Sequence, residues 1–139
     1  MEPINLNSYT LLLVDDDPVV EEHLGEFLRG HFKEVYSAKN ALEGFDIFED
    51  KKPDVVVTDI EMEKMNGIEL ARAIKSIEPS TVVIMVTGFN DDEYRNAANE
   101  IMVDDYIMKP LNFQTLLDSI KNAFRVSRFN SLTNEYTKY

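Results

Sequence analysis

Leu11-Leu12-Leu13-Val14-Asp15-Asp16-Asp17-Pro18 joins four aliphatic residues directly to three carboxylates and a proline. An unbroken aliphatic run of this length is typical of a strand that is buried on both faces, as in a parallel sheet. Asp17-Pro18 predicts a helix start, because Asp is a favoured N-cap and proline suits the first helical position. This octapeptide therefore predicts a buried strand that passes through an acidic turn into a helix.

The same alternation of strand and helix continues along the chain. Further aliphatic or β-branched runs occur at Val35-Tyr36, Val55-Val56-Val57, Val82-Val83-Ile84-Met85-Val86 and Tyr106-Ile107-Met108. Between the runs, apolar residues recur three or four positions apart, which is the period of a helix. The expected buried faces are Val20, Leu24, Phe27 and Leu28; Ala38, Leu42 and Phe45; Leu70, Ile74 and Ile77; Tyr94, Ala97, Ala98 and Ile101; and Phe113, Leu117, Ile120 and Phe124. The expected N-caps of the last three helices are Asn66, Asn90 and Asn112.

Five strand–helix units in succession predict an α/β fold with a five-stranded parallel sheet and helices on both faces. The 139 residues suffice for one domain. We assign residues 1–8 to an N-terminal lead and residues 9–126 to this domain. Residues 127–139 are either an extension of the last helix or a linker.

The composition limits the classes of function that the chain can have. Its formal net charge is −12, from 14 Lys and Arg against 26 Asp and Glu. Such a chain gains nothing from counterion release on a phosphate backbone, which argues against direct binding of nucleic acid. The absence of cysteine excludes disulfides, thiolate metal sites and a cysteine nucleophile. Because there is no signal peptide and no apolar run of membrane-spanning length, we expect a cytoplasmic protein without membrane contact.

Polar side chains follow four of the five expected strands. They are Asp15-Asp16-Asp17, Thr58-Asp59-Ile60-Glu61, Thr87-Gly88 and Lys109-Pro110. The carboxyl ends of parallel strands meet at one edge of the sheet, which is where open α/β sheets bind ligands. Two carboxylates about 4 Å apart repel by about 4 kcal/mol at an effective dielectric constant of 20, so either a cation offsets them or one of them holds a proton. A site with a few oxygen ligands and no cysteine suits Mg²⁺ better than Ca²⁺ or a softer metal.

This metal hypothesis also selects an order for the strands. Neighbouring strands lie about 4.8 Å apart, so Asp16 and Asp59 can share an ion only if the first and third strands are adjacent. The order 2-1-3-4-5 meets this condition, whereas the order 3-2-1-4-5 places another strand between the two carboxylates. The expected architecture is therefore the flavodoxin-like three-layer sandwich, with a parallel sheet of order 2-1-3-4-5 and five helices.

Asp59 can act in such a site as a nucleophile toward phosphorus. A carboxylate that attacks a phosphoryl group forms an acyl phosphate. The transition state spreads negative charge over three equatorial oxygens. Mg²⁺, the Lys109 ammonium and the Thr87 hydroxyl would each contact one of these oxygens. Gly88 would leave room for the group close to the main chain.

From Leu11 to about Phe124, the chain resembles the response-regulator receiver domains of the CheY-like superfamily. The matching pieces are Leu11-Leu12-Leu13-Val14-Asp15-Asp16-Asp17-Pro18, Asp54-Val55-Val56-Val57-Thr58-Asp59 with Met65-Asn66-Gly67, Val86-Thr87-Gly88, and Asp105-Tyr106-Ile107-Met108-Lys109-Pro110. The resemblance implies that Asp59 is the phosphoacceptor. It also implies that Asp15, Asp16 and Asp59 hold Mg²⁺ together with the backbone carbonyl of Glu61.

Further roles follow from the same resemblance. Thr87 and Lys109 would contact the phosphoryl group, and Tyr106 would be the aromatic residue that rotates in the switch. From the residues alone, Tyr106 is equally well explained as a core aromatic. The resemblance further implies a cis Lys109–Pro110 peptide bond. His23 and His31 are expected to be solvated surface residues.

The function that the resemblance implies is phosphoryl signalling. A sensor histidine kinase or a histidine phosphotransfer protein would phosphorylate Asp59, and the domain would later dephosphorylate itself. Phosphorylation would change the face formed by the fourth helix, the fifth strand and the fifth helix. The output would be a downstream protein or a covalently linked output domain, so the domain would be a switch and not an enzyme.

Two departures from the family pattern are visible, and two other functions are open. The loop Glu61-Met62-Glu63-Lys64-Met65 lacks the usual proline, and Met102-Val103 replace residues that are usually small. One alternative is a Mg²⁺-dependent phosphohydrolase of the haloacid-dehalogenase type. Such enzymes carry a second Asp two residues after the nucleophile, where this chain has Glu61, and a cap insertion. The other alternative is an interaction module of the same fold that is not phosphorylated.

Overall fold

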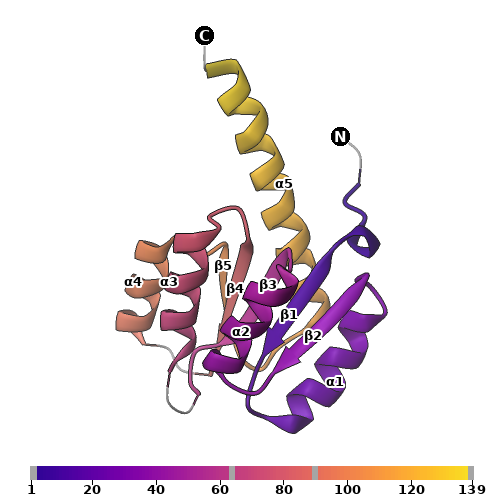
Figure 1. The fold of residues 1–139 in the computed structure, drawn as a ribbon, viewed down its shortest axis with the longest axis vertical. Coiled ribbons are helices and arrows are strands. Elements are labelled where there is room, and N and C mark those ends of the chain that lie inside the picture. Colours follow the sequence, from indigo (N-terminus) through magenta and orange to yellow (C-terminus); the bar gives the residue numbers. More distant parts are fainter. Residues whose placement is uncertain (1–2, 63–64, 89–90, 138–139) are drawn as a thin grey trace.

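The computed structural model describes residues 3–62, 65–88 and 91–137, and for residues 128–137 only the course of the helix. The elements are a short 3₁₀ helix (Leu6–Ser8), β1 (Thr10–Val14), α1 (Pro18–Arg29), β2 (Glu34–Ala38), α2 (Ala41–Lys51), β3 (Val55–Asp59), α3 (Gly67–Ile77), β4 (Val82–Thr87), α4 (Asp92–Ile101), β5 (Asp105–Met108) and α5 (Phe113–Thr137). The strands form one parallel sheet of order β2-β1-β3-β4-β5 (Figure 1). The predicted order and the α/β class are therefore confirmed.

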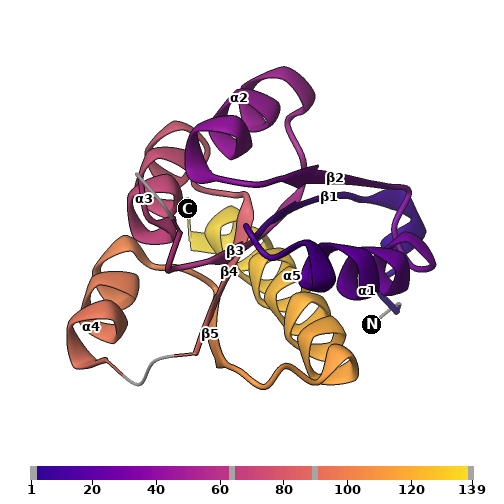
Figure 2. The same ribbon diagram turned by 90° about the horizontal axis from the view of Figure 1, so that it is seen from below.

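Helices cover both faces of the sheet in three layers. Figure 2 shows α1 and α5 on one face and α2, α3 and α4 on the other. Successive residues of a strand point to opposite faces. In β1, Leu11 and Leu13 pack with α1 and α5, whereas Leu12 and Val14 pack with α2 and α3. This two-sided burial explains why the strand sequences are continuously aliphatic.

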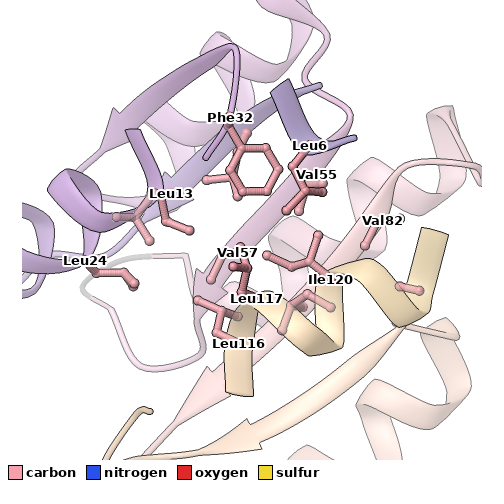
Figure 3. Packing of buried hydrophobic residues seen from close by; sticks show 14 of the residues in the cluster. Leu6, Leu13, Leu24, Phe32, Val55, Val57, Val82, Leu116, Leu117 and Ile120 are labelled. Atoms are coloured by element: carbon pink, nitrogen blue, oxygen red, sulfur yellow. The ribbon is translucent and has the colours of Figure 1, made fainter. Parts of the chain in front are cut away.

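The core beneath α1 and α5 also includes the segment before β1. Figure 3 shows the side chains of this cluster gathered between β1, β3 and α5, with Leu13 and Val57 among them. Ile4 and Leu6 are buried in the same cluster, at 7% and 5% exposure. Part of the N-terminal lead thus contributes apolar surface to the fold.

Side-chain caps start the helices near the functional edge of the sheet. Asp17 accepts a hydrogen bond from the Val19 N–H at 2.9 Å, with Pro18 at the first helical position, as predicted. Asn66 and Asn112 cap α3 and α5, also as predicted. The N-cap of α4 is Asp91 and not Asn90, which lies outside the described residues. Asn and Asp are equally good N-caps, so the sequence does not show which of these two neighbouring residues precedes the first turn of α4.

The expected apolar face of the second helix was wrong at two residues. Ala38 is buried, but it is the last residue of β2 and not part of a helix. Leu42 is 54% exposed. The residues that α2 buries instead are Ala41, Gly44 and Phe48. The 3.6-residue period was correct, but the helix begins later and is rotated relative to the expected stripe.

The expected face of the third helix was wrong at its last residue. Leu70 and Ile74 are buried, as predicted. Ile77 is 56% exposed because it ends α3, past the turn that packs against the sheet. The buried stripe was therefore extended one step too far.

The last helix, α5, is much longer than the others. It runs as one element from Phe113 to Thr137, a length of 25 residues. Leu116, Leu117 and Ile120 of its first half are buried against the sheet. Its second half projects beyond the rest of the domain (Figure 1). Residues 127–137 therefore continue the helix.

A polar contact on α1 links this helix to β2. Glu21 accepts hydrogen bonds from Arg29 at 2.7 Å and from Ser37 at 3.0 Å. Arg29 reaches back over Gly25, where an added Cβ would lie 3.3 Å from its guanidinium nitrogens. The hydrogen bonds from Arg29 and Ser37 lower the pKa of Glu21. The contact therefore stabilises the fold when Glu21 is ionised.

We predict that Glu21→Gln lowers the free energy of unfolding by about 0.2–1 kcal/mol near pH 7, the range measured for exposed ion pairs. Because the folded-state pKa lies below the ordinary value of 4.5, this difference should be complete above pH 4.5 and disappear as the pH falls through the folded-state pKa. Urea unfolding of both chains across this range measures it. Glu22→Gln, at an exposed neighbour, is the control, and a pH-independent loss would contradict the prediction.

Candidate functional site

Three carboxylates from two adjacent strands meet at the carboxyl edge of the sheet. Asp15 and Asp16 follow β1, and Asp59 ends β3. Each offers an oxygen atom, and these three atoms all lie within 4.8 Å of one another. The direct pairing of β1 with β3 brings the two strand ends together. The predicted clustering of Asp16 and Asp59 is therefore present.

The acidic turn after β1 is fixed by its own backbone. The Asp15 N–H donates to the Ala38 carbonyl at 3.1 Å, and the Asp15 carboxylate accepts from the Asp17 N–H at 2.9 Å. Asp15 is buried, whereas Asp16 is exposed. The turn thus places one carboxylate inside the site and presents the next toward solvent.

Lys109 lies between two of the carboxylates. Its Nζ is 3.3 Å from Oδ2 of Asp59 and 3.7 Å from Oδ2 of Asp15. The other oxygen of Asp59, Oδ1, accepts a hydrogen bond from the Glu61 N–H at 3.2 Å. A single ammonium does not balance three carboxylates, so the site keeps an excess of negative charge that favours a further cation.

Burial and charge set the protonation tendencies of the site. Burial raises the pKa of Asp15; the Asp17 N–H and Lys109 oppose this effect, while Asp59 and Asp16 add to it. For Lys109, burial by itself lowers the pKa, but Asp15 and Asp59 together outweigh burial and the pKa is raised. Lys109 is therefore held as an ammonium beside Asp59.

The start of α3 comes unusually close to Asp59. The Gly67 N–H donates to the Ile60 carbonyl at 2.9 Å. A Cβ at residue 67 would lie 2.0 Å from the Asp59 carbonyl oxygen and 2.9 Å from its carbonyl carbon. Only glycine fits this close backbone approach. Sequence reasoning gave Gly67 no role of its own, although its place directly after the Asn66 cap was a usable signal.

The remaining expected residues surround the carboxylates at different depths. Thr87 is buried at the end of β4, and its carbonyl accepts from the Lys109 N–H at 2.8 Å. The Lys109–Pro110 bond is cis, as expected. Glu61 is exposed beside Asp59, and its interaction with Tyr94 of α4 raises the pKa of Tyr94. Tyr106 is half-buried and packs in the cluster on the α3 side.

A cavity of about 230 Å³ opens beside the acidic cluster. Asp15, Asp59 and Lys109 line it together with apolar residues of α1 and of the segment after β5. The apolar lining from α1, from the segment after β5 and from the first residue of α5 comprises Val19, Val20, Leu24, Pro110, Leu111 and Phe113. His23 also lines this cavity, and it is exposed, as expected for a solvated residue. Its position one helical turn after Val19 was the signal that it faces the same side of α1.

Comparison with known proteins decides the family. The model of a response regulator receiver domain matches residues 11–121. The chain is a response regulator receiver domain. It therefore belongs to two-component response regulators, and the strand-end motifs lie within the matched range.

Curated relatives of this receiver domain are longer proteins. The chain is 34% identical over 129 residues to a cyclic di-GMP phosphodiesterase of Thermotoga maritima, covering 93% of this chain and 34% of the relative. It is 37% identical over 112 residues to an uncharacterized response regulatory protein of Vibrio cholerae, covering 78% and 42%. The chain thus spans about a third to two fifths of the length of these relatives.

Solved receiver domains share the fold. A CheY-like receiver domain protein from Methanospirillum hungatei matches with a TM-score of 0.84 at 30% identity, covering 88% of this chain and 98% of that one. A receiver domain protein from Clostridium thermocellum matches with a TM-score of 0.80 at 31% identity, covering 87% and 98%. Among the described residues, no helix has the length and apolar character needed to cross a membrane.

The oxygens of this receiver domain fit Mg²⁺. Ligands on opposite sides of an octahedral Mg²⁺ are about 4.2 Å apart, since each bond is about 2.1 Å. The observed spacing of up to 4.8 Å among Asp15, Asp16 and Asp59 needs only a small closing movement to hold the ion. An all-oxygen donor set with spare negative charge is also the chemistry that Mg²⁺ prefers.

Proposed function

We propose that this receiver domain is a phosphorylation-controlled switch in which Asp59 accepts a phosphoryl group from a phosphohistidine with the help of Mg²⁺. The observation that carries the proposal is the Asp59 carboxylate, buried to 8% exposure, with Lys109 Nζ at 3.3 Å and the Asp15 and Asp16 carboxylates beside it. A carboxylate, a fixed ammonium and a divalent-cation site are the components that transfer of a phosphoryl group requires.

The transfer step is a displacement at phosphorus. An oxygen of Asp59 forms a bond to phosphorus while the phosphorus–nitrogen bond of the phosphohistidine breaks, and the electron pair of that bond stays on the imidazole nitrogen. Lys109, kept protonated by Asp15 and Asp59, contacts a phosphoryl oxygen, and the Thr87 hydroxyl contacts another. Asp15, Asp16, Asp59 and the Glu61 carbonyl would hold Mg²⁺, which would supply positive charge beside the phosphoryl oxygens.

We expect Asp16→Ala to weaken Mg²⁺ binding by at least about tenfold, since it removes one charged ligand from a site with few protein ligands. Asp16 is exposed, so the loss is not explained by damage to the core. Titration of Mg²⁺ followed by NMR shifts of the residues around Asp59 measures the affinity.

Glu22→Ala is the matched control for this titration, because it removes an exposed carboxylate of α1 that lies outside the cluster. It should leave Mg²⁺ affinity within about twofold of the wild type, since salt screens a solvent-exposed charge that does not contact the ion. An Asp16→Ala chain that titrates like Glu22→Ala would remove Asp16 from the ligand set.

The partner that fits the site is a protein that presents a phosphohistidine, either a sensor histidine kinase or a histidine phosphotransfer protein. The cavity beside Asp59 has apolar walls from α1 and from the segment after β5. Val19, at its edge, is 57% exposed. Apolar surface beside a nucleophile contributes little to the binding of a wholly polar donor, but it stabilises contact with a protein surface.

The output follows from the change of charge at Asp59. A phosphoryl group on Asp59 adds oxygens that Lys109 and Thr87 can bind, and Tyr106 and the α4–β5–α5 face respond by a shift in population. A downstream protein, or an output domain in the same chain, would recognise that face. Later hydrolysis of the acyl phosphate resets the domain, so we propose a switch and not an enzyme with multiple turnovers.

Two features disfavour a phosphohydrolase of the haloacid-dehalogenase type. The position two residues after Asp59 is Glu61, where such enzymes carry an Asp. The connection between β3 and α3 runs only from residue 60 to residue 66, which leaves no room for a cap. Turnover of a small phosphomonoester would nevertheless favour the enzyme.

The proposal is tested by incubating the chain with Mg²⁺ and a small acyl phosphate. One phosphoryl group should be added, as measured by intact mass spectrometry. A folded chain that binds Mg²⁺ but gains no mass would contradict a switch at Asp59 and favour an unphosphorylated interaction module.

A further inference from the structure

α4 is the helix that the core holds least firmly. Of its ten residues, Ala98 alone is fully buried. Its first turn is capped by Asp91, which accepts from the Glu93 and Tyr94 N–H groups. Few buried apolar side chains mean that its position depends on individual contacts at its surface.

One of these contacts is made by Arg95 with the ring of Tyr106. The guanidinium carbon of Arg95 lies 4.8 Å from the ring centroid, within the distance of a cation–π interaction. Arg95 is exposed, while Tyr106 is half-buried in β5. The guanidinium therefore covers the outer face of the ring, with the cluster of α3 and α4 side chains on the inner side.

The Tyr106 side chain points inward, against the cluster on the α3 side. Its hydroxyl group does not explain this position. It is buried, and it has no hydrogen-bond partner among the described residues. A buried hydroxyl without a partner costs free energy, so another interaction must hold the side chain in place. Packing and the guanidinium of Arg95 are the interactions that the described part of the chain offers.

We propose that Arg95 is a positioning residue: its guanidinium holds the Tyr106 ring inward, and the position of Tyr106 is thereby tied to that of α4. The contact exists in the unphosphorylated chain and is independent of the proposed function; only its use in signalling rests on that function. In this chain the inward position of Tyr106 is therefore populated before any phosphoryl transfer.

The test compares Arg95→Gln with the wild type by NMR of the unphosphorylated, Mg²⁺-free chain. In the wild type, the Arg95 side-chain protons should be shifted upfield by the Tyr106 ring. In Arg95→Gln, the outward population of Tyr106, read from its χ1 couplings, should rise about two- to fivefold, the factor that corresponds to an exposed cation–π interaction. Arg72→Gln, at an exposed arginine of α3, is the control and should change neither signal.

Two further variants test the guanidinium group of Arg95 and the hydroxyl group of Tyr106 separately. Arg95→Lys keeps the charge but not the planar group, so it should restore the inward population only in part. Tyr106→Phe should keep the upfield shift of Arg95, because the hydroxyl has no partner among the described residues. Unchanged Tyr106 populations in Arg95→Gln, or loss of the upfield shift in Tyr106→Phe, would overturn the proposal.

Repeating Arg95→Gln in an Asp59→Asn background distinguishes the two proposals, since the Arg95 effect should persist there whether or not Asp59 is a phosphoacceptor.

Discussion

The Asp59→Asn chain is expected to gain no phosphoryl mass when it is incubated with Mg²⁺ and a small acyl phosphate, whereas the wild type gains one group. The amide of Asn is uncharged and is a poor nucleophile, so no acyl phosphate forms. Intact mass spectrometry, followed by mapping of the modified peptide, measures the difference. The expected effect is the complete loss of labelling.

The fold of this variant should be intact. Removing the charge of Asp59 relieves its repulsion by Asp15 and Asp16, but it also removes the ion pair with Lys109 at 3.3 Å, so the two effects oppose each other. Urea unfolding should therefore give a free energy close to that of the wild type in the absence of Mg²⁺. Asp46→Asn, at an exposed carboxylate of α2, is the matched control and should label normally. Labelling that survives in Asp59→Asn would place the phosphoacceptor elsewhere.

Gly67→Ala is expected to lose about 3 kcal/mol of stability, the upper part of the range for overpacked sites. The new Cβ would lie 2.0 Å from the Asp59 carbonyl oxygen, and that atom belongs to the backbone and has no alternative rotamer. Either α3 must move away from β3 or the end of β3 must bend. Equilibrium unfolding in urea measures the loss, and a shift of the Asp59 amide resonance reports the movement.

Gly88→Ala provides the comparison at the same edge of the sheet. A Cβ at residue 88 would meet no atom of the described residues within 4 Å, and no described glycine has a positive φ. Its stability should therefore stay within about 0.5 kcal/mol of the wild type, as for a substitution at an open surface position. If both alanine variants lose the same stability, the close approach of Gly67 to Asp59 is not the cause.

The sheet was predictable from the sequence because its strands are buried on both faces. Runs such as Val55-Val56-Val57 contain no polar residue, and short β-branched runs of this kind are typical of strands with helices on either side. The order of the strands in the sheet was harder to predict, because the spacing of apolar residues does not indicate which strands are neighbours. It followed from a chemical condition instead: Asp16 and Asp59 had to be close enough to share one ion.

Contacts between elements distant in sequence were not predictable in the same way. Whether Leu42 or Ala41 faces the core depends on the rotation of α2 about its axis, which a period of 3.6 residues does not fix. The pairing of Arg95 with Tyr106 depends on how α4 lies against β5. The need for glycine at residue 67 depends on the path of the loop after β3. Each of these is set by tertiary packing.

The length of α5 gives the domain a mechanical property. A helix of 25 residues is about 37 Å long at 1.5 Å per residue. Its first half is packed against the sheet, and its second half extends past the sheet. A change in the tilt of the packed half therefore moves the projecting end. The projecting half is about 19 Å long, so a tilt of about 5° where the helix leaves the sheet would move its tip by about 1.6 Å. Small rearrangements at the sheet would thereby be amplified far from where they arise.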